Sequence, residues 1–288
     1  MAKPSRAAGQ SPLRNKMWEE RWHPFRREWL VIAAHRNQRP WSGAGAARSA
    51  EDVSPYLHDC YLCPRNARVH GAANPDYQGI FVFDNDHPCV GPDAPLDLPA
   101  PTPPYRRRDA RGTARVVCYT PRHDLRLARL PVSQIDDLLR CWADQERDLA
   151  RRDGVRYVLM FENNGKAVGV SNPHPHCQIY ATNFVFRTVE EILAAEREHG
   201  NSLMRDVIHA ERTDGTRILH DADGALSFVP YFARYGYETY VVPERRVPRL
   251  AALSDSERLA LAAALKAALV RLDNLWQMPM PYVMVLHQ

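Results

Sequence analysis

The hydrophobic and polar positions of this 288-residue chain alternate between the period of a strand and the period of a helix. Apolar residues return at helical spacing behind recognisable capping residues. Between these stretches lie short runs rich in β-branched and aromatic residues, which are typical of strands. The predicted strands are Glu28–Ala34, Gly79–Phe83, Ala114–Tyr119, Arg156–Glu162 and His176–Thr182. The pattern therefore predicts a mixed chain of short strands and amphipathic helices.

Three helices are predicted from their ends. A Ser or Thr followed three residues later by Glu has the spacing of a capping box, in which the two side chains bond the N–H groups of the first turn. A glycine beyond the last apolar position is the usual stop. The three predicted spans are Ser133 to Asp153-Gly154, Thr188 (with Glu191) to Gly200, and Ser254 (with Glu257) through Leu259–Leu272.

Two segments are predicted to lack regular structure. Residues 1–20 are polar, and we expect a flexible arm. The stretch Gly91–Tyr105 contains six prolines. Because proline donates no backbone hydrogen bond, this stretch is predicted to be a surface loop.

The chain also contains a weak internal repeat. Val116–Leu130 resembles Val241–Leu253, and each copy precedes a predicted helix. Each helix is followed by a strand, Tyr157–Met160 in the first copy and Tyr282–Val285 in the second. The first copy continues into His176–Thr182, whereas the second has no such continuation. The repeat predicts two similar halves, of which the second lacks a last strand.

Composition narrows the class of protein. The net charge is +4 and arginine is spread along the chain, so nucleic-acid binding is not indicated, whereas a phosphorylated small molecule suits the charge. There is no uncharged apolar run of membrane-spanning length. The N-terminal residues, among them Lys3, Arg6 and Glu19, lack the apolar core of a secretory signal. We therefore expect a cytoplasmic protein with no membrane partner.

The six cysteines are expected to be thiols, because disulfides are rare in cytoplasmic proteins. Cys89, Cys118 and Cys141 are predicted to pack as small hydrophobic residues. Cys60-x-x-Cys63 differs, since this spacing brings two sulfurs within reach of one tetrahedral metal. On its own, this motif supplies only two of the four ligands of a tetrahedral metal site. A βα redox context, the usual alternative for this motif, is not visible around it.

The most informative stretch is His174-Pro175-His176-Cys177-Gln178. If the segment is extended, His174, His176 and Gln178 share one face, and Cys177 points the other way and packs. A single buried histidine is most often a satisfied core residue. Three polar groups on one face among apolar neighbours are costly to bury, however, which indicates a working site.

Four motifs, occurring in order, carry a family resemblance. They are Asn172–Gln178, Cys60-x-x-Cys63, Phe161-Glu162-Asn163 and His35–Trp41. Together they resemble the galactose-1-phosphate uridylyltransferase family of the histidine-triad superfamily, over roughly residues 21–288. The resemblance implies an α+β, HIT-like fold, in which two similar halves form an open antiparallel half-barrel sheet with flanking helices, in a homodimer. The halves would be residues 21–186, with the zinc and catalytic motifs, and residues 187–288, incomplete relative to the family.

The resemblance also implies a reaction. His176 would attack the α-phosphorus of a UDP-sugar, release a sugar 1-phosphate and pass the uridylyl group to a second sugar 1-phosphate, as with UDP-glucose and galactose 1-phosphate. A neutral imidazole suits this ping-pong relay, because it is both a nucleophile and a good leaving group near neutral pH. Gln178 is placed to bond a non-bridging phosphoryl oxygen. The rigid Pro175 is expected to hold its carbonyl against the other ring nitrogen of His176.

The family's ligand and substrate positions map onto this chain. The implied cofactor is one structural Zn²⁺, held in a closed tetrahedral site by Cys60, Cys63, His123 and His174. Residues matching those that enclose uridine and ribose are Leu62, Val69, Asn85, Asp86, Phe161, Asn163 and Ser171. Arg36 and Arg39 match arginines that reach phosphate from the neighbouring subunit, although in so arginine-rich a chain each also fits a solvated surface charge.

The chain departs from the family at two places. Relatives continue past His287 through a His-x-His strand and a loop that grips the hexose phosphate. In relatives with a second metal, one Glu and three His hold it; here His287 and either Glu190 or Glu191 match two of these ligands, so we expect no second metal. His87 also follows Asp86 where the family has an aromatic residue.

Three functions are therefore weighed. The first is uridylyl transfer between hexose 1-phosphates. The second keeps the histidine relay with another nucleotide such as ADP, another phosphorylated acceptor, or water, and the shortened C-terminus favours it. The third is a zinc-stabilised nucleotide-binding or dimer-forming protein without activity, against which the intact His176-x-Gln178 argues.

Overall fold

The computed structural model describes residues 18–33, 53–95 and 98–288. Its strands are β1 (Trp18–His23), β2 (Glu28–Ala33), β3 (Phe81–Asp84), β4 (Gly112–Cys118), β5 (Tyr157–Asn164), β6 (His176–Thr182), β7 (Ile218–Ala222), β8 (Ala225–Phe228), β9 (Tyr240–Pro243) and β10 (Tyr282–Leu286). The helices are α1 (Val132–Leu149), α2 (Arg187–Glu198), α3 (Leu203–Asp214) and α4 (Asp255–Trp276). Short 3₁₀ helices precede α1 and α4, namely η3 (Leu127–Arg129) and η5 (Leu250–Ala252).

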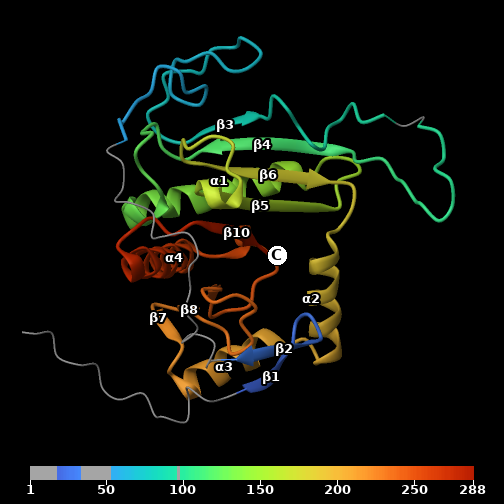
Figure 1. Ribbon diagram of the computed structural model, residues 1–288, viewed down its shortest axis with the longest axis vertical. Helices are drawn as coiled ribbons and strands as arrows, with labels where there is room; N and C mark the ends of the chain where they lie inside the picture. Colours follow the sequence, from blue (N-terminus) through green and yellow to red (C-terminus); the bar gives the residue numbers. More distant parts are fainter. Residues whose placement is uncertain (1–17, 34–52, 96–97) are drawn as a thin grey trace, which may run out of the picture.

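The largest sheet is antiparallel throughout and has the strand order β10-β5-β6-β4-β3 (Figure 1). Alternate side chains of its central strands point to one face, where Val117, Met160 and Ile179 are fully buried. Helices α1 and α4 cover this face, and their apolar side chains join the strands in the main core. The opposite face of the sheet carries the segments described next.

A loop segment covers part of that second face. Cys60, Leu62, Cys63 and Tyr77 pack on Val116 and Cys118 of β4 in a separate apolar cluster. The register of β4 and β6 places Val116 opposite Gln178 and Cys118 opposite His176. The predicted metal loop and the predicted catalytic strand are therefore neighbours on one sheet face.

The second half of the chain contributes a smaller antiparallel sheet, in the order β7-β8-β9. Every residue of β8 is buried, because α3 packs on one side through Ile208 and α4 on the other through Ala260 and Ala264. Helix α4 thus lies between the small sheet and α1, as Figure 1 shows. This position explains why apolar side chains surround most of α4 instead of forming one stripe.

The predicted repeat is visible as a symmetric pairing. Strands β5 and β10, each the strand after the long helix of its half, pair with Met160 opposite Leu286 and Phe161 opposite Val285. Helices α1 and α4 also pack against each other. In the first half, β6 pairs with both β4 and β5. Across the described ranges no strand lies between their counterparts β9 and β10.

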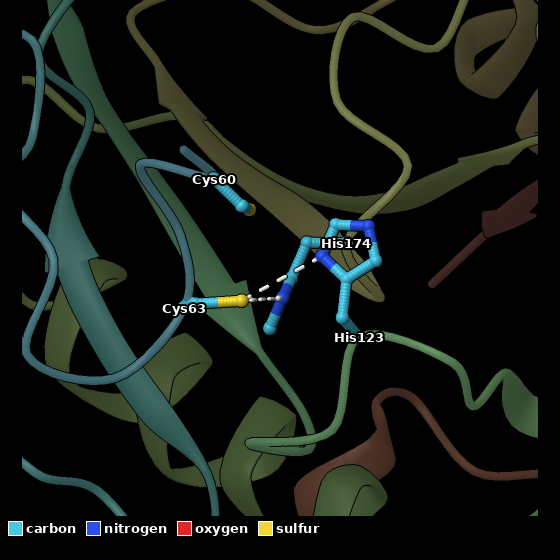
Figure 2. Close-up of side chains that lie close together, drawn as sticks. All are labelled: Cys60, Cys63, His123 and His174. Atoms are coloured by element: carbon cyan, nitrogen blue, oxygen red, sulfur yellow. Dashed lines mark hydrogen bonds between the residues drawn. The ribbon is translucent and has the colours of Figure 1, made fainter. Parts of the chain in front are cut away.

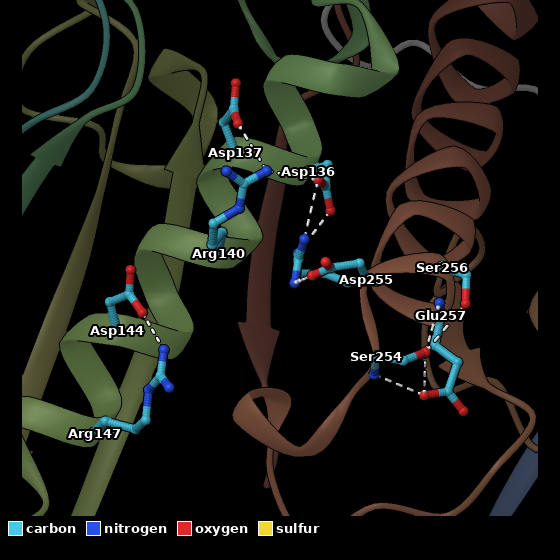
Figure 3. A network of polar contacts seen from close by, with 10 residues as sticks. Asp136, Asp137, Arg140, Asp144, Arg147, Ser254, Asp255, Ser256 and Glu257 are labelled. Atoms are coloured by element: carbon cyan, nitrogen blue, oxygen red, sulfur yellow. Dashed lines mark hydrogen bonds and ion pairs between the residues drawn. The ribbon is translucent and has the colours of Figure 1, made fainter.

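A buried ion pair links the two long helices, α1 and α4. Asp136 of α1 accepts from the Arg258 guanidinium of α4 at 2.7 Å. It also accepts from Arg140 at 3.1 Å (Figure 3). The same view shows the capping box of α4, in which Ser254 and Glu257 bond each other's backbone N–H groups. A buried pair with both partners satisfied specifies how the helices meet, even though its net stabilisation is small.

The predicted strands are confirmed with end shifts of one or two residues, and β6 has the predicted bounds. The Gly91–Tyr105 stretch forms a loop wherever it is described. The capping box at Ser254 is confirmed. All six cysteines are free thiols, as expected, but Cys89 is exposed and does not pack in the core.

Two predicted helix starts are wrong. Helix α1 begins after Pro131, whose carbonyl accepts the first backbone bonds, so Ser133 is already inside the first turn. Helix α2 begins after Phe186, which leaves Thr188 at the second helical position, where its hydroxyl caps nothing. In both cases a backbone carbonyl and local chain direction set the start instead of a side-chain cap. Helix α1 also ends at Leu149, before the predicted Asp153.

Several elements were not predicted. Strands β7 and β8 and helix α3 have too few residues typical of their secondary structure to be recognised from the sequence. Strand β7, for example, includes His and Asp, and its structure depends on the surrounding helices. Strand β1 begins at Trp18, inside the predicted flexible arm, and pairs with β2 as a separate hairpin. The rest of the arm, residues 1–17, lies outside the described residues.

The fold is therefore α+β, as predicted, with its described strands in three separate antiparallel sheets. None of the helices described here has the length and apolar content needed to cross a lipid bilayer.

Glu162 is a buried carboxyl group at the junction of the two halves. It is 2% exposed, and it accepts from the hydroxyls of Tyr119 at 2.6 Å and Tyr282 at 2.9 Å. Burial raises the pKa of Glu162 to about 7, although the two hydroxyls act in the opposite direction. In the unfolded chain its pKa is near 4.5. The folded protein therefore binds an extra proton between these two pKa values.

We predict that Glu162 makes the protein less stable as pH rises from about 4.5 to 7. The unfolded carboxyl ionises in this window while the folded one stays neutral, which lowers the free energy of unfolding by up to about 1.4 kcal/mol per pH unit. Glu162→Gln removes this titration. Urea denaturation from pH 4 to 8 should show wild-type stability falling relative to the variant within the window and levelling above it.

The matched control is Tyr282→Phe, which removes one hydroxyl but keeps the carboxyl group and should retain the pH dependence. Buried histidines titrate in all three proteins alike, so their contribution cancels in the comparison. A stability difference between wild type and Glu162→Gln that stays constant with pH would contradict the prediction.

Candidate active site and metal centre

His174 lies in the irregular turn before β6, so the alternation of the strand does not by itself place its side chain. Its ring nevertheless contacts Tyr77, which packs on the same sheet face as His176 and Gln178. Prolines at 173 and 175 remove two backbone donors, which keeps this turn out of the sheet. The residues that alternate on the pocket face of β6 are His176, Gln178 and Tyr180.

Cys177 points into the core, as predicted. It is 1% exposed, and its sulfur accepts from the indole N–H of Trp142 at 3.1 Å. Cys177, Ile179 and Ala181 anchor β6 on the α1 side of the sheet. The polar side chains of the strand are thereby held on the opposite face.

One hydrogen bond orients the His176 ring. Its Nδ1–H donates to the carbonyl oxygen of His174 at 2.8 Å, which leaves Nε2 as the free basic nitrogen. The acceptor belongs to His174 and not, as predicted, to Pro175, because the turn before β6 directs the carbonyl two residues back towards the ring. Burial lowers the pKa of His176, although the bond to His174 partly opposes this. The ring is therefore a neutral imidazole near pH 7.

Five of the predicted site residues line one small pocket of about 40 Å³. They are Phe161, Asn163, Ser171, His176 and Gln178. The wall is completed by Cys177 and by residues 169 and 170 of the loop between β5 and β6, where Gly169 has a positive φ of 77°. A larger hollow of about 410 Å³ near the end of α1 contains none of the predicted residues.

The predicted metal ligands come together. Cys60, Cys63, His123 and His174 are buried, and their ligand atoms all lie within 4.8 Å of one another. Figure 2 shows the four side chains converging, with the Cys63 sulfur 3.6 Å from Nδ1 of His123 and 3.5 Å from Nδ1 of His174. A sulfur and a nitrogen on one tetrahedral ion, at roughly 2.3 and 2.05 Å, would lie about 3.6 Å apart.

Outer contacts orient the ligands. The Nε2–H of His174 faces the carbonyl oxygen of Thr120 at 3.1 Å and the hydroxyl of Tyr77 at 3.0 Å, so its Nδ1 is free for a metal. The backbone N–H of Leu62 donates to the Cys60 sulfur at 3.4 Å. Asn172 Oδ1 accepts from the N–H of His174 at 2.8 Å, which fixes the turn.

The donor set fits a metal ion. Burial raises the pKa of the Cys63 thiol to about 11 and lowers the pKa of His174 to about 4. Two buried thiols and two neutral imidazoles stabilise one another little, because none of them is charged. A divalent cation would have its charge balanced by two thiolates. The Nε2 of His123 has no hydrogen-bond partner, so this ring is held less firmly than that of His174.

The other predicted substrate residues lie outside the pocket lining. Leu62 is buried in the metal loop, and Val69 is 54% exposed. Asn85 and Asp86 follow β3, where Asp86 pairs with Arg68 at 3.7 Å. Arg36 and Arg39 lie outside the described residues.

Sequence reasoning missed three residues around these sites. Tyr180 continues the alternation of β6, which was the signal available for it. Tyr77 contacts the ring of His174, a candidate metal ligand, and Arg68 lies over the ring of Phe83 at 4.4 Å. Nothing in their local sequence marks these two, because their roles arise from tertiary packing.

The chain is similar to known proteins over most of its length. The family model described as galactose-1-phosphate uridyl transferase, N-terminal domain, matches residues 10–185, and the corresponding C-terminal domain matches residues 189–288. A galactose-1-phosphate uridylyltransferase from Haemophilus influenzae is 34% identical, with 94% of this chain and 80% of that protein covered. One from Rattus norvegicus is 35% identical, with 93% and 71% covered.

The fold is also similar to that of a solved structure. A solved structure described as a uridylyltransferase superposes with a TM-score of 0.72 at 31% identity, covering 94% of this chain and 80% of that one.

We predict that the four-ligand cluster binds one metal ion that stabilises the fold. Cys60→Ser should remove the bound metal and lower the melting temperature by roughly 10 °C, because the buried cluster then loses its central charge. Metal content by mass spectrometry and thermal denaturation would measure both effects. Cys118→Ser is the matched control, since Cys118 is buried in the same apolar cluster but is not a ligand. Full metal retention in Cys60→Ser would contradict the assignment.

Proposed function

The chain belongs to the galactose-1-phosphate uridylyltransferase family, and we propose that it transfers the uridylyl group through a covalent intermediate on His176. It is a transferase that moves UMP between a UDP-hexose and a hexose 1-phosphate. The observation that carries the mechanism is the 2.8 Å bond from His176 Nδ1–H to the His174 carbonyl inside the pocket, because it presents a neutral Nε2.

In the first step, Nε2 of His176 attacks the α-phosphorus of UDP-glucose. A nitrogen–phosphorus bond forms as the bond from that phosphorus to the bridging oxygen breaks, and glucose 1-phosphate leaves with the electron pair. In the second step, a phosphate oxygen of galactose 1-phosphate attacks the same phosphorus and releases His176. Because imidazole is a good leaving group from phosphorus, the intermediate is reactive in both directions.

Gln178 assists at the phosphorus. It lines the pocket beside His176, and its amide N–H groups can donate to a non-bridging phosphoryl oxygen as charge moves there. Asn163 and Ser171, which line the same pocket, supply further polar groups for the nucleotide. We assign Asn85 and Asp86 to ribose and base contacts on the basis of the family resemblance. Arg36 and Arg39 would reach phosphate.

The metal in this proposal is zinc in a structural role. Two thiolates and two imidazoles fill a tetrahedral shell, which leaves no position for substrate or water. When bound, the ion supplies only a fixed point for the loop and for the turn at His174. In this proposal the side chains that act at the phosphorus are those of His176 and Gln178 on β6.

We also propose that the two halves follow the open half-barrel arrangement of the family. The symmetric β5–β10 pairing and the packing of α1 on α4 support this, because each is a contact between equivalent elements of the repeat.

A homodimer completes the proposal. The β1–β2 hairpin presents Trp22 and Trp29 as a cross-strand pair with ring centroids 5.3 Å apart, and Trp29 is 62% exposed. Val31, on the same face, is also exposed. An exposed apolar face of this kind is typical of an interface. Arg36 and Arg39 follow β2 within six residues, so a dimer formed here would place them near the partner.

We predict that UDP-glucose labelled in the α-phosphate labels His176 and that galactose 1-phosphate discharges the label. His176→Ala should lose the label and lower the transfer rate by at least roughly 10³-fold, because the nucleophile is gone. His209→Ala, on the exposed side of α3, is the control. The adduct would be located by alkaline quench and peptide mass spectrometry. An unlabelled but fully active enzyme would rule out the covalent route, and label discharged only by another acceptor would favour the broader nucleotidyltransferase reading.

We predict that Trp29→Glu converts the dimer into a monomer, because a charge cannot be buried unpaired at an apolar interface. Light scattering after gel filtration should give twice the chain mass for wild type and for the control Leu275→Glu, an exposed residue of α4. A variant that keeps the wild-type mass would exclude the hairpin as the interface.

A further inference from the structure

Tyr180 is the third residue on the pocket face of β6. Its hydroxyl donates to Oε1 of Gln178 at 3.1 Å. Its ring meets the ring of Phe161 edge-on, with centroids 4.8 Å apart, and Phe161 lies opposite Gln178 in the β5–β6 register. Tyr180 is therefore held by its ring and contacts Gln178 through its hydroxyl.

This contact decides which end of the Gln178 amide is free. A phosphoryl oxygen only accepts hydrogen bonds, so the NH₂ end of the amide must face it. The carbonyl and amino groups of an amide point in different directions from one carbon. When the Tyr180 hydroxyl donates a hydrogen bond to Oε1, the NH₂ group of the amide is left available. The flipped amide would instead present its partially negative carbonyl oxygen to the phosphate.

We propose that Tyr180 is a positioning residue for uridylyl transfer, holding Gln178 with its NH₂ group towards the phosphoryl oxygens at His176. The inference rests on the proposed function and names a group that acts through Gln178 without touching the reacting atoms. A fixed donor needs no reorganisation when charge develops, which is how such contacts accelerate transfer.

The surroundings of Tyr180 keep the proton on its hydroxyl. Burial raises the pKa of Tyr180, and the nearby thiol of Cys89 raises it further. The hydroxyl is thus protonated throughout the neutral range. Cys89 is exposed, and a thiol is only a weak hydrogen-bond partner, so it competes poorly with an amide oxygen.

The test removes the hydroxyl and keeps the ring. Tyr180→Phe should slow formation of the uridylyl-histidine at saturating UDP-glucose by about tenfold, the scale of one hydrogen bond, with KM changed by less than about twofold. The burst of glucose 1-phosphate after rapid mixing measures this step directly. The melting temperature should stay unchanged, because the contact with Phe161 remains.

A double-mutant cycle separates positioning from a general structural effect. Adding Tyr180→Phe to Gln178→Ala should cause no further loss, because the group being positioned is already absent. Both single variants should also weaken, in parallel, the preference between the two α-phosphorothioate diastereomers of UDP-glucose, since Gln178 contacts one non-bridging oxygen. Loss of packing alone would not change that preference.

Two controls match the change. Tyr157→Phe removes a hydroxyl from β5 that faces the backbone of Gln288, and Cys89→Ala removes the other neighbour of the Tyr180 hydroxyl. Both should keep the wild-type burst rate.

The outcomes distinguish the two levels of the proposal. A wild-type enzyme that forms no uridylyl-histidine overturns the proposed function itself. If the wild type forms the uridylyl-histidine, either of two results overturns the role of Tyr180 alone. One is that Tyr180→Phe forms the intermediate as fast as the wild type. The other is that Tyr180→Phe causes the same loss of rate in the Gln178→Ala background as in the wild type.

Discussion

The hydrogen bond between the His176 ring and the His174 carbonyl joins the two centres of this protein. His174 provides both contacts, since its ring belongs to the four-residue cluster that could hold a metal ion and its carbonyl accepts from the His176 ring and so sets its tautomer. Asn172 holds the same turn from the other side. A displacement of the loop that carries Cys60 and Cys63 would therefore reach the His176 ring through the backbone from His174 to His176. In the proposed mechanism, a structural metal would in this way support the reaction without taking part in its chemistry.

The sheet gives that turn a rigid support. Each central strand presents one set of side chains to the core under α1 and α4, and the other set to the pocket. Because strand side chains alternate, burying Cys177 and Ile179 fixes Gln178 on the opposite face, and a slip of one residue would invert the arrangement. The large core thus determines the direction of a few polar groups, which explains why most of the chain is far from the reaction.

Much of this was predictable from the sequence, for identifiable reasons. Cys60 and Cys63 were singled out by the spacing of their motif, and His176 by its alternation with Gln178. His123 and the pocket residues Phe161, Asn163 and Ser171 came from the family resemblance alone. The bent backbone at His174 was not predicted, because the prolines keep residues 173–175 out of the strand that begins at His176. The starts of α1 and α2 depend on backbone carbonyls, and β7 and β8 on the helices around them. Tyr77 and Arg68 depend on contacts distant in sequence.

The two halves of the chain contribute different parts of the described structure. Every described residue of the pocket and metal cluster lies in the first half, while the second half adds β10 beside β5 and α4 beneath the sheet. The hydroxyl of Tyr282 reaches Glu162, whose neighbours Phe161 and Asn163 face the pocket. Since Glu162 is bonded from both halves, the second half holds the position of the strand that lies next to His176. It therefore acts on the reaction through backbone placement, without contributing a described residue to the pocket lining.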